Sequence, residues 1–259
     1  MSTNNSDEYD IAIIGGGMVG ASLACLLANT SLRIALVDRQ LFDESAIPVT
    51  QVQPRFDARV SAITAASRNL FDQMGLWDDI AAMRCCGYSN MQVWDADGTG
   101  SVSFSAGDVN QLELGNIVEN SVILSALYKK LDLIDHVDLI TPFSIESFQR
   151  DQDANKITLR SIDGNNLTAK LLVAADGASS KIRELAEFAT KEWDYNHLAL
   201  VTTVKTEAAH RNTAFQRFMP TGPLAFLPLA ESASDSGQKF SSIVWSAIPE
   251  RSEELMFMS

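Results

Sequence analysis

The chain has little cysteine, little histidine and no long apolar run. Its 259 residues include three cysteines and three histidines, and none stand at spacings typical of metal ligands or of a disulfide framework. No apolar run approaches the roughly 18 to 20 residues that a membrane-spanning helix needs. The first eight residues lack the basic start and apolar core of a signal peptide. We therefore expect a short disordered lead-in and a cytoplasmic protein without metal, disulfide or transmembrane segment.

Basic residues are also scarce. Twenty lysines and arginines stand against 33 acidic residues, so the formal net charge is −13. Such a charge repels nucleic acid and anionic lipid at long range, which makes a nucleic-acid partner unexpected. The length is sufficient for one large domain or two modest ones with a substantial core.

The clearest motif lies near the N-terminus. An apolar run at residues 11–14 precedes Gly-Gly-Gly-Met-Val-Gly at residues 15–20, and a helical segment and a second apolar run follow. This order predicts strand, turn, helix and strand. Gly15, Gly17 and Gly20 have the spacing in which the first glycine permits the tight turn, the second admits a pyrophosphate, and the third lets helix and strand pack closely. A dinucleotide is the expected ligand.

Asp38 and Arg39 bear on which dinucleotide the turn suits. Asp38 ends the second apolar run, where a carboxylate can accept hydrogen bonds from ribose hydroxyls. A site for a 2′-phosphate would have a small residue followed by basic ones at this position, so Asp38 argues against NADP, although the basic Arg39 is adjacent. We expect FAD or NAD in preference to NADP.

A second motif follows an apolar run at residues 171–175, which reads as a buried strand. The run stops at Asp176 and Gly177, and a helix with serine caps then contains Arg183. This places Asp176 at the carboxyl end of a strand, the edge of an α/β sheet at which ligands bind.

The remaining pattern predicts a mixed chain of helices and short strands. Asn120 or Ser121 is expected to cap a helix over residues 116–131. Arg55 and Arg59 end a long loop, and they are either candidates for phosphate contact or simply solvated surface arginines. Other helices are expected at 64–74, 77–83 and from 250, a hairpin around Asp97-Gly98, strands at 137–140, 144–148, 157–160 and 167–174, and an antiparallel sheet from 200–204, 215–219, 224–229 and 242–247.

Four segments together carry a family resemblance. They are residues 15–20, residues 57–63 (Asp-Ala-Arg-Val-Ser-Ala-Ile), residues 174–180 (Ala-Ala-Asp-Gly-Ala-Ser-Ser) and residues 222–229 (Gly-Pro-Leu-Ala-Phe-Leu-Pro-Leu). In combination they resemble the FAD-dependent aromatic hydroxylases. Within that family the chain is similar to the ubiquinone-biosynthesis hydroxylases, and residues 117–123 and 193–195 are similar to the 2-octaprenylphenol hydroxylase branch in particular.

The resemblance implies an α/β fold like that of p-hydroxybenzoate hydroxylase. A Rossmann-like FAD-binding domain, residues 1–84 and 108–187, would carry an inserted, mostly antiparallel substrate domain, residues 85–107 and 188–259. Family members carry a further FAD motif around a Gly-Asp pair. This chain stops before any such motif, so we expect a fold incomplete at the C-terminus and a chain that is inactive alone.

The resemblance also implies the roles of individual residues. The glycines of the turn would hold the FAD pyrophosphate, Asp38 the ribose, and Arg59 the region near the flavin, while the catalytic residues stay unassigned. Asn120 stands at a helix start where many members of that family have an arginine. The expected FAD and NAD(P)H contacts are Gly15, Gly17, Gly20, Asp38, Arg39, Arg59, Asn120, Asp176, Gly177 and Arg183, and the expected substrate walls are Phe226, Leu227, Pro228 and Leu229.

The implied reaction is hydroxylation of a prenylated phenol in ubiquinone biosynthesis. NAD(P)H would reduce FAD, O₂ would add at C4a, and the hydroperoxide would transfer OH to the ring. Other ubiquinone-biosynthesis enzymes would be partners, with peripheral attachment at the inner membrane as an alternative to a purely cytoplasmic location. Two alternatives stay open: a flavin-dependent reductase or epoxidase of an isoprenoid, and a non-catalytic FAD-binding fragment or assembly subunit.

Overall fold

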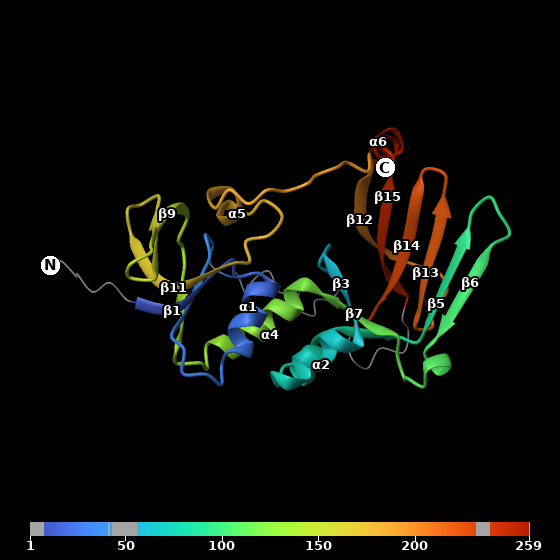
Figure 1. Cartoon of the computed structure of the whole chain (residues 1–259). Helices are drawn as coiled ribbons and strands as arrows, with labels where there is room; N and C mark the ends of the chain where they lie inside the picture. Colours follow the sequence, from blue (N-terminus) through green and yellow to red (C-terminus); the bar gives the residue numbers. More distant parts are fainter. Residues whose placement is uncertain (1–7, 41, 43–55, 232–238, 259) are drawn as a thin grey trace. The chain divides into compact units, whose positions relative to one another are not determined.

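The computed structural model describes residues 8–40, 42, 56–231 and 239–258 (Figure 1). By residue contacts the chain divides into two compact units. The first comprises Met1–Glu44 and Leu124–Lys191, and the second comprises Ser45–Ile123 and Glu192–Ser259. The loop before Phe56, with the candidate Arg55, and the expected N-terminal lead-in before Glu8 lie outside the described residues.

The first unit is built on a six-stranded sheet with strand order β8-β2-β1-β11-β10-β9. The strands from β8 to β11 run parallel, and β10 and β9 continue the sheet antiparallel. Helix α5, Lys181–Leu185, follows β11 and places Ile182 in the apolar core on one face. The strands are β1, Glu8–Ile14; β2, Ile34–Val37; β8, Val137–Ile140; β9, Ile145–Asp151; β10, Lys156–Ser161; and β11, Asn166–Ala174.

Helix α1, Met18–Leu26, begins directly after the glycine turn and lies against β1 and β2 (Figure 1). Its neighbour is α4, Asn120–Leu131, where Cys25 of α1 donates through its thiol to the carbonyl of Leu127 over 3.7 Å. Small buried side chains, including Ala21 and Ala24, let α1 approach the sheet closely. The turn is therefore held between the buried end of β1 and the buried side of α1.

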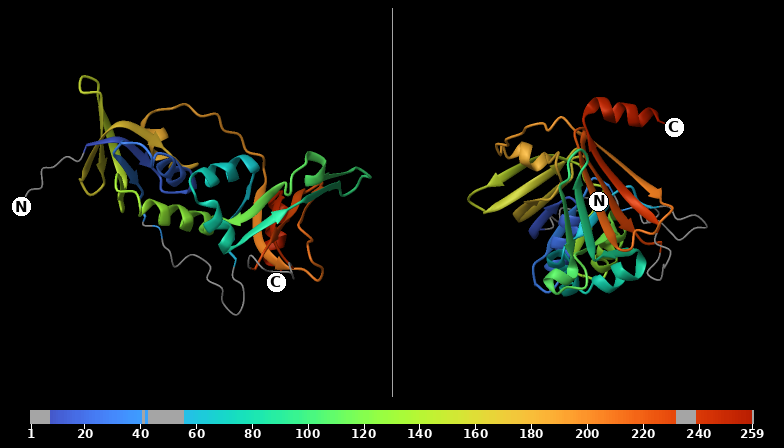
Figure 2. Two further views of the ribbon diagram at one scale, coloured as in Figure 1. Left: turned by 90° about the horizontal axis from the view of Figure 1, so that it is seen from below. Right: turned by 90° about the vertical axis from the view of Figure 1, so that its right-hand side faces the viewer.

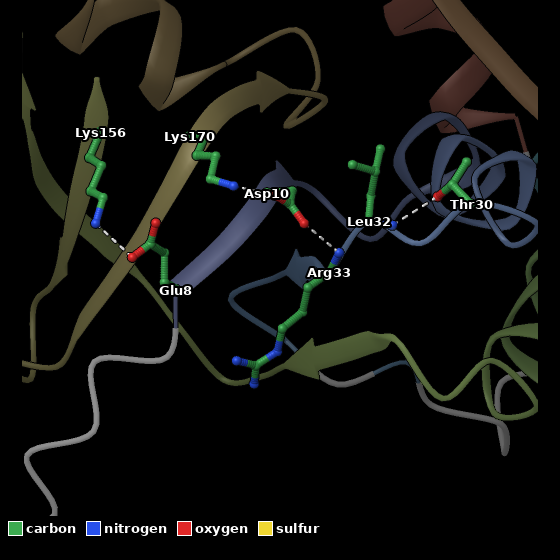
Figure 3. A network of polar contacts seen from close by, with 7 residues as sticks. All are labelled: Glu8, Asp10, Thr30, Leu32, Arg33, Lys156 and Lys170. Atoms are coloured by element: carbon green, nitrogen blue, oxygen red, sulfur yellow. Dashed lines mark hydrogen bonds and ion pairs between the residues drawn. The ribbon is translucent and has the colours of Figure 1, made fainter. Parts of the chain in front are cut away.

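Ion pairs hold the start of β1 in the sheet (Figure 3). Lys156 pairs with Glu8 over 2.6 Å, and Lys170 pairs with Asp10 over 2.7 Å. The Lys170 ammonium, followed by the Arg33 amide, lowers the pKa of the Asp10 carboxyl. These contacts join β1 to both of its neighbours, because Lys170 lies on β11 and Arg33 directly precedes β2.

The second unit contains a six-stranded sheet with order β12-β15-β14-β13-β5-β6, in which only β5 and β13 are paired in parallel among the described strands (Figures 1 and 2). A smaller antiparallel sheet has order β3-β7-β4. The elements are β3, Val60–Ile63; α2, Ala65–Gln73; α3, Trp77–Met83; β4, Cys85–Tyr88; β5, Asn90–Asp95; β6, Ser101–Ser105; η2, Ala106–Val109; β7, Gly115–Glu119; β12, Leu198–Lys205; β13, Thr213–Met219; β14, Gly222–Leu229; β15, Phe240–Ala247; and α6, Pro249–Phe257.

The expected α/β class, with a mostly antiparallel second sheet, is confirmed. The helices expected at 64–74 and 77–83, the hairpin around Asp97-Gly98 and the four strands between 198 and 247 are all present. The functional division into residues 1–84 with 108–187 and 85–107 with 188–259 stays a prediction, since the compact units group 45–84 and 108–123 with the second unit.

Two expectations from the pattern are corrected. The helix predicted from residue 116 begins only at Asn120, because residues 115–119 form β7, which pairs with β3 and β4. The β-branched Ile117 and Val118 suit that buried central strand. The strand before Asp176 is not fully buried, since Leu171 is 52% exposed.

Candidate functional site

The glycine turn has the conformation that its motif predicts. Gly15 adopts φ +106°, and a side chain there would collide with the carbonyl of Ala175, which follows β11. A side chain at Gly20 would collide with the carbonyl of Gly15, so helix and strand are in close contact. At Gly17 an added Cβ would meet no atom of the described residues within 4 Å. The turn is thus tight where the motif requires packing and open where it requires approach of a ligand.

The N-terminus of α1 is available to an anion. Its N-cap, Gly17, offers no side chain, and no acidic residue lies in the first turn. By contrast, α2 and α5 are capped by the hydroxyls of Thr64 and Ser180. Uncapped N–H groups and the positive end of the helix dipole favour phosphate. This fits the pyrophosphate of a dinucleotide.

Asp38 lies beside the turn, as predicted. Its carboxylate accepts the N–H of Gly16 over 2.6 Å and the N–H of Gln40 over 2.9 Å. The strand register places Val37, Ile14 and Ala174 in one row, so the residues that follow them meet at the same edge of the sheet. The carboxylate therefore lies where a ribose hydroxyl could donate to it, while also bracing the turn.

Tyr128 and Gly16 belong to this site but were missed from the sequence. The Tyr128 hydroxyl of α4 donates to the carbonyl of Gly16 over 3.0 Å, and Phe42 stacks on the Tyr128 ring with centroids 4.5 Å apart. Burial, followed by the charge of Asp38, raises the pKa of Tyr128 to about 12. An added Cβ at Gly16 would collide with that hydroxyl. The one sequence signal for Gly16 was its place in a run of three glycines.

Asp176 acts chiefly on its own helix. Its carboxylate accepts the Ser180 hydroxyl over 2.5 Å and the Lys181 and Ile182 amides over 2.7 and 3.2 Å. Gly177 adopts φ +83°, and Arg183 donates to the carbonyl of Ala178 over 2.6 Å. The predicted trio of Asp176, Gly177 and Arg183 therefore forms one closed turn at the carboxyl end of β11, adjacent to Gly15.

Three further predicted contacts lie elsewhere. Arg39 is exposed directly after Asp38. In the second unit, the Arg59 side chain is exposed and its carbonyl accepts the Asn120 amide over 3.0 Å. The Asn120 side-chain oxygen accepts the Ser61 hydroxyl over 2.7 Å. Arg59 and Asn120 are thus brought together at the start of α4, with Asn120 bound to β3.

The four expected substrate walls lie on β14 and alternate between its faces. Phe226 pairs across the sheet with Phe215 and Ile243, whereas Leu227 pairs with Ser242 on the opposite face. Leu229 is 3% exposed. Only Phe226 with Pro228, or Leu227 with Leu229, can therefore line any one cavity, and their role as substrate walls stays a prediction.

The described ranges also bear on metal binding and on membrane-spanning helices. These contain no group of three or more His, Cys, Asp or Glu residues that could hold a metal ion. Each histidine has a backbone partner; the buried His210, for example, contacts the Leu229 carbonyl over 3.1 Å. No helix in these ranges is both long and apolar enough to cross a membrane.

Comparisons with known proteins agree with this geometry. The profile of a family described as FAD binding domain matches residues 8–234. The chain is 38% identical to the mitochondrial ubiquinone biosynthesis monooxygenase COQ6 of Xenopus tropicalis, over 100% of this chain and 55% of that protein. It is 35% identical to 3-demethoxyubiquinol 3-hydroxylase of Escherichia coli K12, over 99% of this chain and 61% of that protein. The chain thus spans little more than half the length of these relatives.

Solved structures show the same fold. PqsL of Pseudomonas aeruginosa, crystallised with 2-aminobenzoylacetate, has a TM-score of 0.77 at 22% identity, covering 96% of this chain and 64% of that one. The p-nitrophenol 4-monooxygenase PnpA of Pseudomonas putida DLL-E4 has a TM-score of 0.72 at 17% identity, covering 96% and 60%. At these identities the likeness concerns the fold alone.

Proposed function

Because this chain belongs to the FAD binding domain family, we propose that it forms the cofactor-binding and sheet portion of a flavin monooxygenase acting in ubiquinone biosynthesis. The substrate would be a prenylated phenol, with O₂ and NAD(P)H as co-substrates. The relatives' names support the substrate class, and they favour hydroxylation over a reductase, an epoxidase or a non-catalytic fragment.

One observation carries the proposal: the open, uncapped N-terminus of α1 at a glycine turn beside a carboxylate. Gly17 leaves space for a pyrophosphate, and within the described ranges no side chain caps the N-terminus of α1. Asp38 supplies an acceptor at the adjacent strand end. These are the groups that an adenosine diphosphate moiety requires.

The chain's own residues would bind and orient the cofactor and exclude water from it. Gly15, Gly17 and Gly20 would admit the pyrophosphate, and Asp38 would accept from the ribose. Arg39, Arg59, Asn120, Asp176, Gly177 and Arg183 stay proposed cofactor contacts. When bound, FAD supplies electron transfer from NAD(P)H and activation of O₂ for OH transfer to an electron-rich ring.

The large sheet would contribute a dry wall. The apolar β14 offers Phe226 and Pro228 on one face and Leu227 and Leu229 on the other. Excluding water protects a reactive oxidant from discharge before it meets the ring. Because a prenylated phenol partitions into lipid, we further propose peripheral contact with the membrane through partner enzymes of the same pathway, since a net charge of −13 opposes direct binding to anionic lipid.

FAD titration tests the proposal directly. The purified chain is titrated with FAD while flavin fluorescence and the visible spectrum are followed. We expect saturable binding that Gly17→Trp abolishes, while circular dichroism stays unchanged. If this chain does not bind, a chimera carrying the part of the E. coli hydroxylase that it does not cover is titrated. Failure of both contradicts the proposal.

Product analysis then separates the reactions. A chain or chimera that binds FAD is supplied with NAD(P)H, O₂ and a prenylated phenol. A product heavier by one oxygen atom on the ring supports hydroxylation. NAD(P)H consumption without any oxygenated product would favour the reductase, and oxygen on the prenyl chain would favour the epoxidase.

A further inference from the structure

A buried ion pair lies next to the candidate Arg59 segment. The Arg84 guanidinium contacts both carboxylate oxygens of Glu119, with Nε 2.8 Å from Oε2 and a terminal nitrogen 3.0 Å from Oε1. The two side chains are only 7% and 2% exposed. Burial raises the pKa of Glu119, while the Asp57 amide and Arg84 act in the opposite direction. Removing both charges from water costs desolvation free energy, so such a pair adds little net stability to a fold.

The pair is connected to the backbone just before β3. Glu119 accepts the amide of Asp57. The Asp57 carboxylate in turn accepts the Arg59 amide over 2.9 Å and the Ser121 amide over 3.2 Å. The Arg59 carbonyl accepts the Asn120 amide. Residues 57–59 are therefore fastened to the start of α4 at several points, and the exposed Arg59 side chain projects from a fixed backbone.

Arg84 also contacts the segment before β3 directly, through the ring of Phe56. Its guanidinium carbon lies 4.9 Å from the centroid of the Phe56 ring, and Phe56 packs on Phe240 of β15 with centroids 5.3 Å apart. A guanidinium can stack on an aromatic face while its edge binds a carboxylate, which a lysine could not do. Arg84 thus contacts Phe56 directly and reaches Asp57 through Glu119.

We infer that Glu119, Arg84 and Asp57 are positioning residues that fix the backbone of Arg59 for contact with the cofactor. The inference rests on the proposed function, since Arg59 is there a proposed cofactor contact. None of the three is required to touch FAD. Their effect on affinity should therefore pass through the Arg59 side chain, and it should vanish when that side chain is removed.

A double-mutant cycle tests this dependence. The variant Arg84→Met with Glu119→Leu replaces the buried pair by apolar side chains of similar size, an exchange that folds commonly tolerate. It leaves the Asp57 amide without its acceptor. We expect FAD affinity to fall about tenfold in the native background and by about twofold or less in an Arg59→Ala background, a coupling usual within one hydrogen-bonded network. Equal losses in both backgrounds, or no loss, would overturn the inference.

Asp57→Ala provides a second route. It keeps the buried pair but removes the acceptor of the Arg59 and Ser121 amides, so we expect the same dependence on Arg59. Amide hydrogen exchange of the cofactor-free chain should quicken at these two amides in both variants. If the pair variant fails to fold by circular dichroism, Asp57→Ala decides the question: unchanged affinity overturns the inference.

The matched control is Arg251→Met with Glu254→Leu. This pair lies on α6 in the same unit, 2.7 Å apart, and its glutamate is 61% exposed. It should leave FAD affinity unchanged. FAD titration of the protein without these substitutions separates the two hypotheses. If neither the native chain nor the chimera binds FAD, the proposed function is contradicted and this inference is removed with it. Native binding with no coupling to Arg59 overturns the positioning role alone.

Discussion

The Tyr128 hydroxyl donates to the carbonyl of Gly16, while the Gly16 amide donates to Asp38. Both polar backbone groups of this glycine are thus held by side chains, one from α4 and one from the end of β2. Gly16 lies between the two glycines that would border a pyrophosphate. The turn is consequently set in place by the protein before a cofactor arrives, which lowers the ordering cost of binding.

Replacing Tyr128 by Phe should weaken this arrangement. The ring and its stack on Phe42 would remain, but the Gly16 carbonyl would lose its donor. A lost hydrogen bond of this kind costs about 1 kcal/mol, so we expect the free energy of unfolding to fall by that amount and FAD affinity to fall several-fold. Chemical denaturation and FAD titration measure the two effects. Tyr195→Phe, at a tyrosine that is 75% exposed, is the control and should change neither.

The same tyrosine should give a delayed ionisation. Its pKa is about 12 when folded and 10.0 in its ordinary state, because burial and the charge of Asp38 disfavour the phenolate. The folded chain therefore retains a proton that the unfolded chain releases, and stability should decline from about pH 10 to about pH 12. Phenolate absorbance against pH should show a late step that Tyr128→Phe removes. If the step in phenolate absorbance that Tyr128→Phe removes is already complete below pH 10, the assignment is contradicted.

Much of the first unit could be predicted from local sequence. Gly15, Gly20 and Asp38 are set by short-range chemistry: a positive φ, two close backbone contacts and the end of an apolar run. Parallel strands then bring Asp176 to the same edge. The Tyr128 contact depends on how α4 packs against the turn, 112 positions away, and no periodicity in the sequence encodes that distance.

The second unit shows where local pattern fails. The pattern predicts helix from residue 116 because residues 116–119 lead directly into one, although Ile117 and Val118 favour the strand that the structure shows. The Glu119–Arg84 pair was also missed, since a charged residue in a sequence reads as exposed unless its partner is known. Both errors have one cause: the partners of β7 come from two distant segments.

Asp176 offers a test that separates a cap from a cofactor contact. Asp176→Ala removes the acceptor of the Ser180 hydroxyl and of two α5 amides, and a lost cap costs about 1 to 2 kcal/mol of unfolding free energy. Asp176→Asn keeps an acceptor oxygen, so stability should largely recover. If FAD affinity recovers with it, the residue acts through α5. A loss of affinity that persists in the Asn variant would show that the charge itself matters to the cofactor.

Gly17 and Gly20 form a matched pair that separates ligand approach from packing. At Gly20 a methyl group would collide with the Gly15 carbonyl, so Gly20→Ala should lower the free energy of unfolding by about 1 to 3 kcal/mol, as overpacking does. At Gly17, φ is −68°, and in the part of the chain that the structure describes no atom lies within 4 Å of an added methyl group. Gly17→Ala should leave thermal stability unchanged or slightly raised, because alanine has less freedom in the unfolded chain. It should nevertheless weaken FAD binding, since the methyl group occupies space that the pyrophosphate would use.

Thermal melts without cofactor, followed by FAD titration of each variant, measure the stability and the affinity of the Gly17 and Gly20 variants. Undiminished affinity in a stable Gly17→Ala protein would mean that the phosphates do not approach this turn.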